Sequence, residues 1–193
     1  MVEFKNVTKK YKNGKNDSAV LEDLSLTLQS GTKTVIMGES GCGKTTLLRI
    51  LAGLEVADSG EVVCDEKIAL MFQEPRLLPW KTALENVKAV LGKQYFHLAD
   101  KYLESVGLGD DKNKLPHSLS GGMAQRVALA RFLAFAEATD ATLLLLDEPF
   151  SALDEETAAK MLSLILEFST GRTLLIVSHH LPDLPFADEI ITL

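Results

Sequence analysis

The segment at residues 38–45, Gly-Glu-Ser-Gly-Cys-Gly-Lys-Thr, limits the possible folds of this chain more than any other. An apolar run at residues 34–37 precedes it, as expected of a buried strand. Residues 46–52 have helical composition, and Gly53 stands where a helix C-cap glycine belongs. Strand, glycine-rich loop and helix form the context of the phosphate-binding pattern G-x-x-x-x-G-K-T, known as Walker A. A flexible surface turn is the alternative interpretation, which the full match in this context disfavours.

The residue types in this loop suit a chain of phosphates. Glycines let backbone N–H groups point inward, and the N-terminus of the following helix adds partial positive charge. We expect Lys44 to contact the β- and γ-phosphates and the hydroxyl of Thr45 to ligate Mg²⁺, so the predicted cofactors are ATP and Mg²⁺. The predicted nucleotide contacts are Gly38, Glu39, Ser40, Gly41, Cys42, Gly43, Lys44, Thr45 and Thr46.

Composition and charge narrow the classes of protein. The chain has 193 residues, 46% of them hydrophobic, which suits one globular domain. Its longest aliphatic run, residues 143–146, is much shorter than the roughly 20 residues of a membrane span. A net charge of −7 disfavours nucleic acid or anionic lipid as an electrostatic partner. The start of the chain lacks a secretion-signal pattern, and two cysteines are too few for a disulfide framework, so we expect a cytoplasmic protein.

Strands alternate with helices along the chain, which predicts an α/β fold with a largely parallel central sheet. Residues 74–119 are helical and amphipathic, and we interpret them as a lobe inserted into a single domain at residues 1–193. Strands are expected at residues 2–8, 19–28, 67–72, 142–146, 173–177 and 190–193, polar turns at 12–18 and 58–60, and helices from about 120 to 138 and at 155–168.

Two acidic residues, Asp147 and Glu148, follow the aliphatic run at residues 143–146. This is the Walker B pattern. Asp147 is expected to hold Mg²⁺ directly or through water, and Glu148 to orient or deprotonate the water that attacks the γ-phosphate. Two solvated acids after a core strand are the alternative, which the Walker A loop upstream makes less attractive.

Residues 119–126, Leu-Ser-Gly-Gly-Met-Ala-Gln-Arg, closely resemble the signature L-S-G-G-Q-x-Q-R of ATP-binding cassette (ABC) ATPases. The resemblance extends over essentially the whole chain in the family's order. It includes the adenine-stacking aromatic at Tyr11, the glutamine loop at Gln73, the D-loop at residues 151–154 and the switch histidine at His179. The resemblance implies a P-loop NTPase core with an N-terminal antiparallel β portion and an inserted helical lobe.

Dimerisation follows from the same resemblance. Family members associate head to tail, with each ATP between the Walker A loop of one subunit and the signature of the other. Ser120, Gly121 and Gly122 would present backbone N–H groups and a helix N-terminus to the γ-phosphate of a partner, expected to be identical.

The remaining site residues take their roles from the resemblance. Tyr11 would stack on adenine, Gln73 would sense Mg²⁺ and the attacking water, and His179 would donate a hydrogen bond to the γ-phosphate. Considered alone, such residues are more often packing, strand-end or structural residues. The catalytic set implied is Lys44, Gln73, Glu148 and His179, and the metal-ligand set is Thr45, Gln73 and Asp147.

Three features depart from the family pattern. Met123 replaces the usual signature glutamine, His180 stands where an acid is common, and the segment from Lys44 to Gln73 is short, which indicates a trimmed β-rich arm. We interpret His97 and Cys64 as structural.

The resemblance predicts the ATPase subunit of an ABC transporter, bound to permease subunits at the cytoplasmic face of the membrane. Residues 73–80 look most like importers of nitrate, sulfonate or taurine, which would add a solute-binding protein. An ABC-class ATPase acting on nucleic acid or ribosomes is one alternative, disfavoured by the acidic charge. A module that binds nucleotide without hydrolysis is another, disfavoured by the intact Lys44, Asp147, Glu148 and His179.

Overall fold

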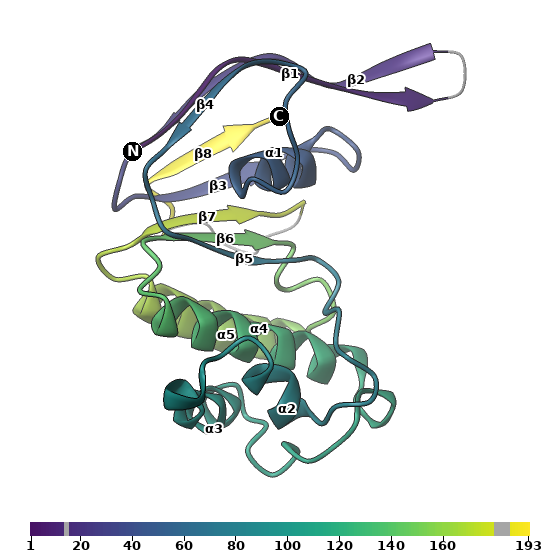
Figure 1. The fold of residues 1–193 in the computed structure, drawn as a ribbon, viewed down its shortest axis with the longest axis vertical. Coiled ribbons are helices and arrows are strands. Elements are labelled where there is room, and N and C mark those ends of the chain that lie inside the picture. Colours follow the sequence, from purple (N-terminus) through teal and green to yellow (C-terminus); the bar gives the residue numbers. More distant parts are fainter. Residues whose placement is uncertain (14–15, 180–185) are drawn as a thin grey trace. The chain divides into compact units, whose positions relative to one another are not determined.

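The chain folds into two compact units in the computed structural model, which describes residues 1–13, 16–179 and 186–193 (Figure 1). The chain passes between the units at several points, and one of them falls between Asp147 and Glu148, so the two predicted Walker B acids belong to different units. Unit 1 contains Met1–Ile68, Thr142–Asp147 and Gly171–Leu193, and unit 2 contains Ala69–Ala141 and Glu148–Thr170.

A parallel sheet forms the centre of unit 1. Four of its five strands lie side by side in the order β6 (Leu143–Asp147), β7 (Thr173–Val177), β3 (Lys33–Met37) and β8 (Glu189–Thr192). Every residue of β6 and β7 is buried, because strands of a parallel sheet are covered on both faces. The helix α1 (Lys44–Leu51) follows β3, as the sequence predicts.

An antiparallel sheet completes unit 1, in the order β2-β1-β4. Its strands are β1 (Val2–Asn13), β2 (Asn16–Leu28) and β4 (Ser59–Cys64). The turn predicted at residues 12–18 is wrong for the described part, because Asn13 pairs with Asn16 and the ladder runs to that point. Residues 14 and 15 lie outside the described residues. Backbone pairing continues through a polar stretch, since it does not depend on which side chains flank the ladder.

The turn predicted at residues 58–60 is also wrong, because Ser59 and Gly60 open β4. Gly60 has φ +88°, and a Cβ added there would lie 2.4 Å from the carbonyl oxygen of Asn6. Glycine is needed at this position because β4 passes close to β1 where the register of the two strands shifts. A glycine that looks like a turn residue in the sequence is therefore a close-approach residue in the fold.

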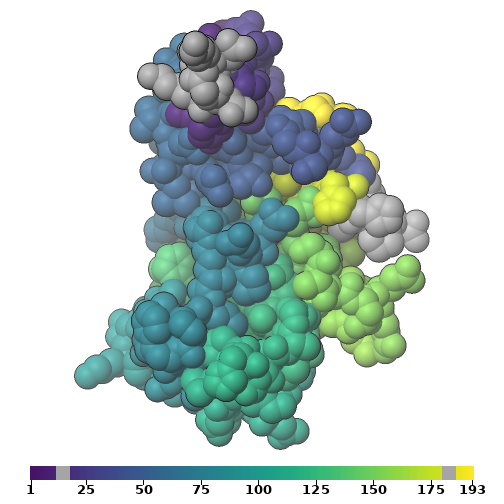
Figure 2. Space-filling model, turned by 90° about the vertical axis from the view of Figure 1, so that its right-hand side faces the viewer, coloured from purple at the N-terminus to yellow at the C-terminus, as the bar shows by residue number. Residues whose placement is uncertain are grey.

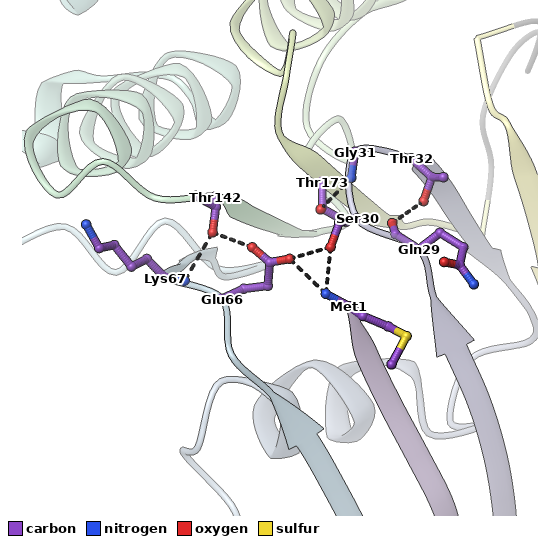
Figure 3. Close-up of polar contacts among 9 residues, drawn as sticks. All are labelled: Met1, Gln29, Ser30, Gly31, Thr32, Glu66, Lys67, Thr142 and Thr173. Carbon is purple, nitrogen blue, oxygen red and sulfur yellow. Dashed lines mark hydrogen bonds and ion pairs between the residues drawn. The ribbon is translucent and has the colours of Figure 1, made fainter.

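The carboxylate of Glu66 forms hydrogen bonds with three other segments of unit 1 (Figure 3). Glu66, 14% exposed, accepts hydrogen bonds from the hydroxyls of Thr142 and Ser30 and from the amino group of Met1. These bonds, that from Thr142 first, lower the pKa of Glu66 to about 2. The hydroxyl of Thr173 accepts from Gly31 N at 2.9 Å, which adds a further bond between the β2–β3 turn and the parallel sheet.

Unit 2 is helical. It contains α2 (Ala83–Lys88), α3 (His97–Ser105), α4 (Gly121–Ala138), α5 (Glu155–Phe168) and two short 3₁₀ helices, Lys93–Tyr95 and Pro116–Ser118. β5 (Ile68–Met71) leads the chain into this unit. α4 packs against both α2 and α3, and the rings of Tyr102 and Phe168 meet edge to face at 5.9 Å. The segment predicted as an inserted lobe lies in unit 2, together with α4 and α5. No described helix combines the length and apolar character of a membrane span.

Candidate nucleotide-binding site

The loop between β3 and α1 holds its lysine close to its own backbone. Lys44 Nζ donates to the carbonyl oxygens of Gly38 and Glu39, at 2.7 Å each, and lies 3.6 Å from Cys42 Sγ. The side chain is largely buried, with Lys44 7% exposed. The loop therefore concentrates one positive charge among its backbone groups, which suits an anionic ligand.

Glycine is required at two positions of this loop. A Cβ added to Gly43, which has φ +103°, would lie 2.6 Å from the carbonyl oxygen of Val20. A Cβ at Gly38 would lie 2.7 Å from both Cys42 Sγ and the carbonyl oxygen of Leu193. Figure 2 shows the end of the chain, in yellow, beside the blue-violet segment that contains the loop. The close packing explains why residues with side chains cannot replace these two glycines.

The start of α1 is open to an anion. Gly43 supplies no side-chain cap, and the first helical turn carries no acidic residue. The backbone N–H groups of the first turn have no partner inside a helix, and the helix dipole adds positive potential there. The residues predicted from the sequence as the phosphate cradle thus have the backbone geometry that this role requires.

Tyr11 lies near this helix start although it is far away in sequence. Its hydroxyl is 3.3 Å from Thr46 Oγ1, and Lys9 Nζ is 5.6 Å from its ring centre. Burial and a hydrogen bond with Glu55 raise the pKa of Tyr11. Tyr11 lies within β1, and 37% of its surface is exposed. An aromatic ring beside the phosphate loop is where a stacking role for adenine would need one.

Asp147 and His179 come to the same edge of the sheet as the loop. Asp147 ends β6 and pairs with Val177, the last residue of β7, and His179 follows two residues later. The carboxyl ends of parallel strands meet at one edge, where ligands bind in open α/β sheets. Asp147 is 3% exposed, and His179 is exposed. His180 lies outside the described residues.

The oxygen atoms at this edge of the sheet are suitable ligands for Mg²⁺. The Thr45 hydroxyl and the Asp147 carboxylate offer the oxygen ligands that Mg²⁺ prefers. The described residues contain no group of three or more His, Cys, Asp or Glu side chains that could enclose a metal. Mg²⁺ usually keeps several waters and uses one or two carboxylates together with substrate phosphates, so two protein oxygens are a suitable set. Gln73 belongs to unit 2 and is exposed after β5.

The signature residues open α4 in unit 2. Ser120 is the N-cap, and its hydroxyl accepts from Met123 N at 3.2 Å. Ser120 and Gly121 are exposed, and the first turn of this 18-residue helix contains no acid. A Cβ added to Gly122 would lie 3.0 Å from the carbonyl oxygen of Ala152. The signature therefore presents a second exposed helix N-terminus, on a different unit from the Walker A loop.

Glu148 has an unusual backbone conformation. Its φ is +46°, in the left-handed region that a residue with a side chain seldom adopts. Its carbonyl oxygen accepts from Ser151 N at 3.3 Å, which closes a turn, and Asp154 then caps α5 by accepting from Thr157 N at 2.9 Å. This backbone bond lowers the pKa of Asp154. The D-loop is thus a short, internally bonded connection between Glu148 and α5.

Two side chains that the sequence assigned no role support these loops. Gln125 Nε2 donates to the carbonyl oxygens of Pro149 at 3.3 Å and Glu148 at 3.5 Å. Arg131 donates from Nη2 to Pro75 O at 2.6 Å and from Nη1 to Arg76 O at 3.1 Å, and its burial lowers its pKa. Both residues lie on α4, and the only sequence signal for them was their place in or after the signature.

Comparison with known proteins identifies the family. Residues 21–151 match the family model described as "ABC transporter", which covers more than half of the chain. This chain belongs to the ABC transporter family. The resemblance seen in the sequence is thereby confirmed.

Curated relatives narrow the kind of ABC protein. The chain is 46% identical over 183 residues to the aliphatic sulfonates import ATP-binding protein SsuB of Pectobacterium atrosepticum, covering 89% of this chain and 67% of that protein. It is 44% identical over 181 residues to SsuB 3 of Paraburkholderia xenovorans, covering 90% of this chain and 70% of the relative. Both relatives are named as ATP-binding proteins of import systems.

Solved structures support the fold. A dimeric structure of a post-hydrolysis state of the ATP-binding cassette MJ0796, bound to ADP and Pi, superimposes with a TM-score of 0.91 at 34% identity, covering 100% of this chain and 94% of that one. The predicted P-loop NTPase fold, with its parallel sheet, antiparallel β portion and helices, is confirmed. This ABC protein is an ATP-binding subunit of the ATPase class.

Proposed function

We propose that this ABC protein is the ATP-hydrolysing subunit of an importer for aliphatic sulfonates. The observation that carries the proposal is its 46% identity, over 89% of the chain, to a protein named as the ATP-binding subunit of such an importer. The segment at residues 73–80 points independently to the importers of nitrate, sulfonate and taurine. Transport would then require separate permease subunits and a solute-binding protein, with this subunit bound at the cytoplasmic face of the membrane.

In the proposed mechanism, unit 1 binds ATP. The backbone N–H groups at the start of α1 and the Lys44 ammonium hold the phosphates, and Tyr11 stacks on the adenine. Thr45 and Asp147 are the residues that would hold Mg²⁺, which neutralises phosphate charge when bound. His179 donates a hydrogen bond to the γ-phosphate as negative charge develops on it.

Hydrolysis is assigned to Glu148 and Gln73. Glu148 accepts a proton from the water that attacks the γ-phosphate, and Gln73 orients that water. The second half of the site comes from another subunit, whose Ser120, Gly121 and Gly122 bind the γ-phosphate at the start of α4. The dimeric form of the solved cassette supports this arrangement, with identical subunits as the simplest case.

Removing the lysine charge tests the binding role of the phosphate loop. Lys44→Ala is expected to abolish tight ATP binding or turnover, because no other group of the loop carries a positive charge. ATPase activity of the purified variant is compared with that of wild type and of Lys10→Ala, which removes one exposed lysine of β1. Wild-type activity in Lys44→Ala would overturn the assignment of this loop.

The transported class is tested with the assembled importer in lipid vesicles. ATPase activity is measured with the solute-binding protein and, in separate assays, ethanesulfonate, propionate or nitrate; the first two anions have a similar carbon skeleton. Stimulation by ethanesulfonate alone is expected. Equal stimulation by both anions, or by nitrate alone, would reject a sulfonate importer while leaving the ATPase assignment in place.

A further inference from the structure

The start of α4 lies against the backbone that carries Glu148. Gln125, on the second turn of this helix, is 2% exposed, and its amide nitrogen lies 3.3 Å from Pro149 O and 3.5 Å from Glu148 O. One turn earlier, a Cβ on Gly122 would approach Ala152 O to 3.0 Å. Two consecutive turns of one helix thus contact the segment from Glu148 to the D-loop, all within unit 2.

This contact falls where the backbone needs support. Glu148 has φ +46°, a conformation that an L-residue keeps only where its surroundings hold it. The amide of Gln125 is shared between the carbonyl oxygens of Glu148 and Pro149, which lie on either side of the Pro149 α-carbon, while Ser151 N donates to the first of them. Both donors favour one orientation of these carbonyls. The direction of the Glu148 side chain follows from that backbone orientation.

We propose that Gln125 is a positioning residue, which holds the left-handed backbone of Glu148 so that its carboxylate faces the attacking water. The inference rests on the proposed role of Glu148 as general base. It also gives the signature helix a task within its own chain, besides the contact with the partner's nucleotide. A general base displaced by about 1 Å can lose about 100-fold in rate, so the contact has a measurable consequence.

The experiment compares two substitutions in the purified full chain. Gln125→Met keeps the length of the side chain and removes the amide, so packing is retained while both hydrogen bonds are lost. We expect kcat to fall about 10- to 100-fold and KM for ATP to change less than about threefold. Gln125→Glu places a carboxylate against two carbonyl oxygens, and the ratio of its kcat to that of wild type should rise as pH falls, because a protonated carboxyl group can donate again.

A stability control separates positioning from general damage. Thr82→Val removes the capping box at the start of α2, in the same unit, and lowers stability without touching the Glu148 segment. Rates are expressed per folded molecule, from thermal unfolding of each variant. Thr82→Val should keep the wild-type kcat.

The same substitution in the Glu148→Gln variant decides whether Gln125 acts through Glu148. In Glu148→Gln, adding Gln125→Met should change the residual rate by less than about threefold, because the group that it positions is already gone. An equal fold-loss in both backgrounds, an unchanged kcat in the single variant or a pure loss of ATP affinity would overturn the proposal. If Glu148→Gln itself hydrolyses ATP like wild type, the general-base assignment fails instead, and the two failures are distinguishable.

Discussion

Glu148 shows how much chemistry depends on one residue's backbone. It follows the buried strand β6 directly, yet its φ of +46° turns the chain away from the extended conformation of that strand. Such conformations cost about 1–3 kcal/mol and persist where other contacts compensate for them. The hydrogen bonds from Ser151 N and Gln125 to its carbonyl group are contacts of this kind.

Replacing the Glu148 carboxylate with an amide should separate binding from hydrolysis. Glu148→Gln keeps the shape of the side chain but cannot accept a proton, so ATP affinity should stay while turnover falls about 10²–10⁴-fold. Equilibrium ATP binding and steady-state phosphate release measure the two effects. A fall in turnover of less than about threefold would show that another group activates the water.

The departure at Met123 should have a small effect. Met123 contributes its backbone N–H to the hydroxyl of Ser120 at 3.2 Å, a bond that any residue except proline can make at this position. Met123→Gln restores the family residue with a similar side-chain length, and its ATPase activity should stay within about threefold of wild type. A complete loss of activity would reveal a specific contact of the thioether.

At the scale of the elements, unit 1 is held together by bonds between strand ends as well as by its buried strands. Glu66 lies after β4 and accepts bonds from the segment before β6, from the β2–β3 turn and from the start of β1 (Figure 3). Charge-assisted hydrogen bonds of a mostly buried carboxylate contribute more than neutral ones. We therefore expect this residue to matter for the stability of the unit that carries the phosphate loop.

Glu66→Gln should lower stability in a pH-dependent way. The pKa of Glu66 is about 2 in the folded protein and about 4.5 ordinarily, so its charge stabilises the fold above about pH 4.5. That contribution declines as pH falls from about 4.5 towards 2, because the unfolded state then binds a proton at Glu66 and the folded state does not. The loss at pH 7 should be about 1–3 kcal/mol, measured by urea unfolding.

The same experiment needs an exposed carboxylate for comparison. Glu61 lies on β4 and is exposed, so Glu61→Gln should leave stability within about 0.5 kcal/mol of wild type at both ends of the pH range. A destabilisation of Glu66→Gln that is constant from pH 7 to pH 3, or that grows as pH falls, would contradict the role of the charge.

At the scale of the whole molecule, the residues assigned to ATP are distributed over both units. The Walker A loop, Asp147 and His179 belong to unit 1, whereas Glu148 and the signature belong to unit 2. The chain has one phosphate loop and a second exposed helix N-terminus at Ser120. In the proposed dimer, the ATP of a second subunit would be the ligand of that helix N-terminus, and the solved cassettes of the same fold are dimeric.

ATP should therefore hold two chains together when hydrolysis is blocked. Glu148→Gln with ATP should accumulate as a dimer, measured by light scattering. Adding Ser120→Arg places a bulky side chain at the start of α4, so the double variant should bind ATP through its own loop and remain a monomer. An ATP-dependent dimer that survives Ser120→Arg would place the signature outside the interface. If Glu148→Gln does not dimerise by itself, the measurement is repeated with the permease subunits, which would align the two chains.

Local sequence determined a large part of this protein. The phosphate loop, the Walker B acids and the signature are short motifs, each formed by consecutive residues. They were sufficient to predict the family and its fold. The helix at Glu155–Phe168 and the strand at Thr173–Val177 agree with the predicted ends, because a capping aspartate and a fully buried aliphatic run mark them locally.

Only the tertiary structure decided the features that depend on distant partners. β1 extends to Asn13 and β2 begins at Asn16, because each strand provides backbone hydrogen-bond partners for the other. Neither segment reveals this pairing by itself. Gly60 lets β4 pass close to the carbonyl oxygen of Asn6, and Glu66 accepts hydrogen bonds from Ser30 and Thr142. The amide of Gln125 faces the carbonyl group of Glu148 because α4 packs there. Each depends on residues that folding brings together from separate parts of the chain, so the sequence contains their chemistry but not their contacts.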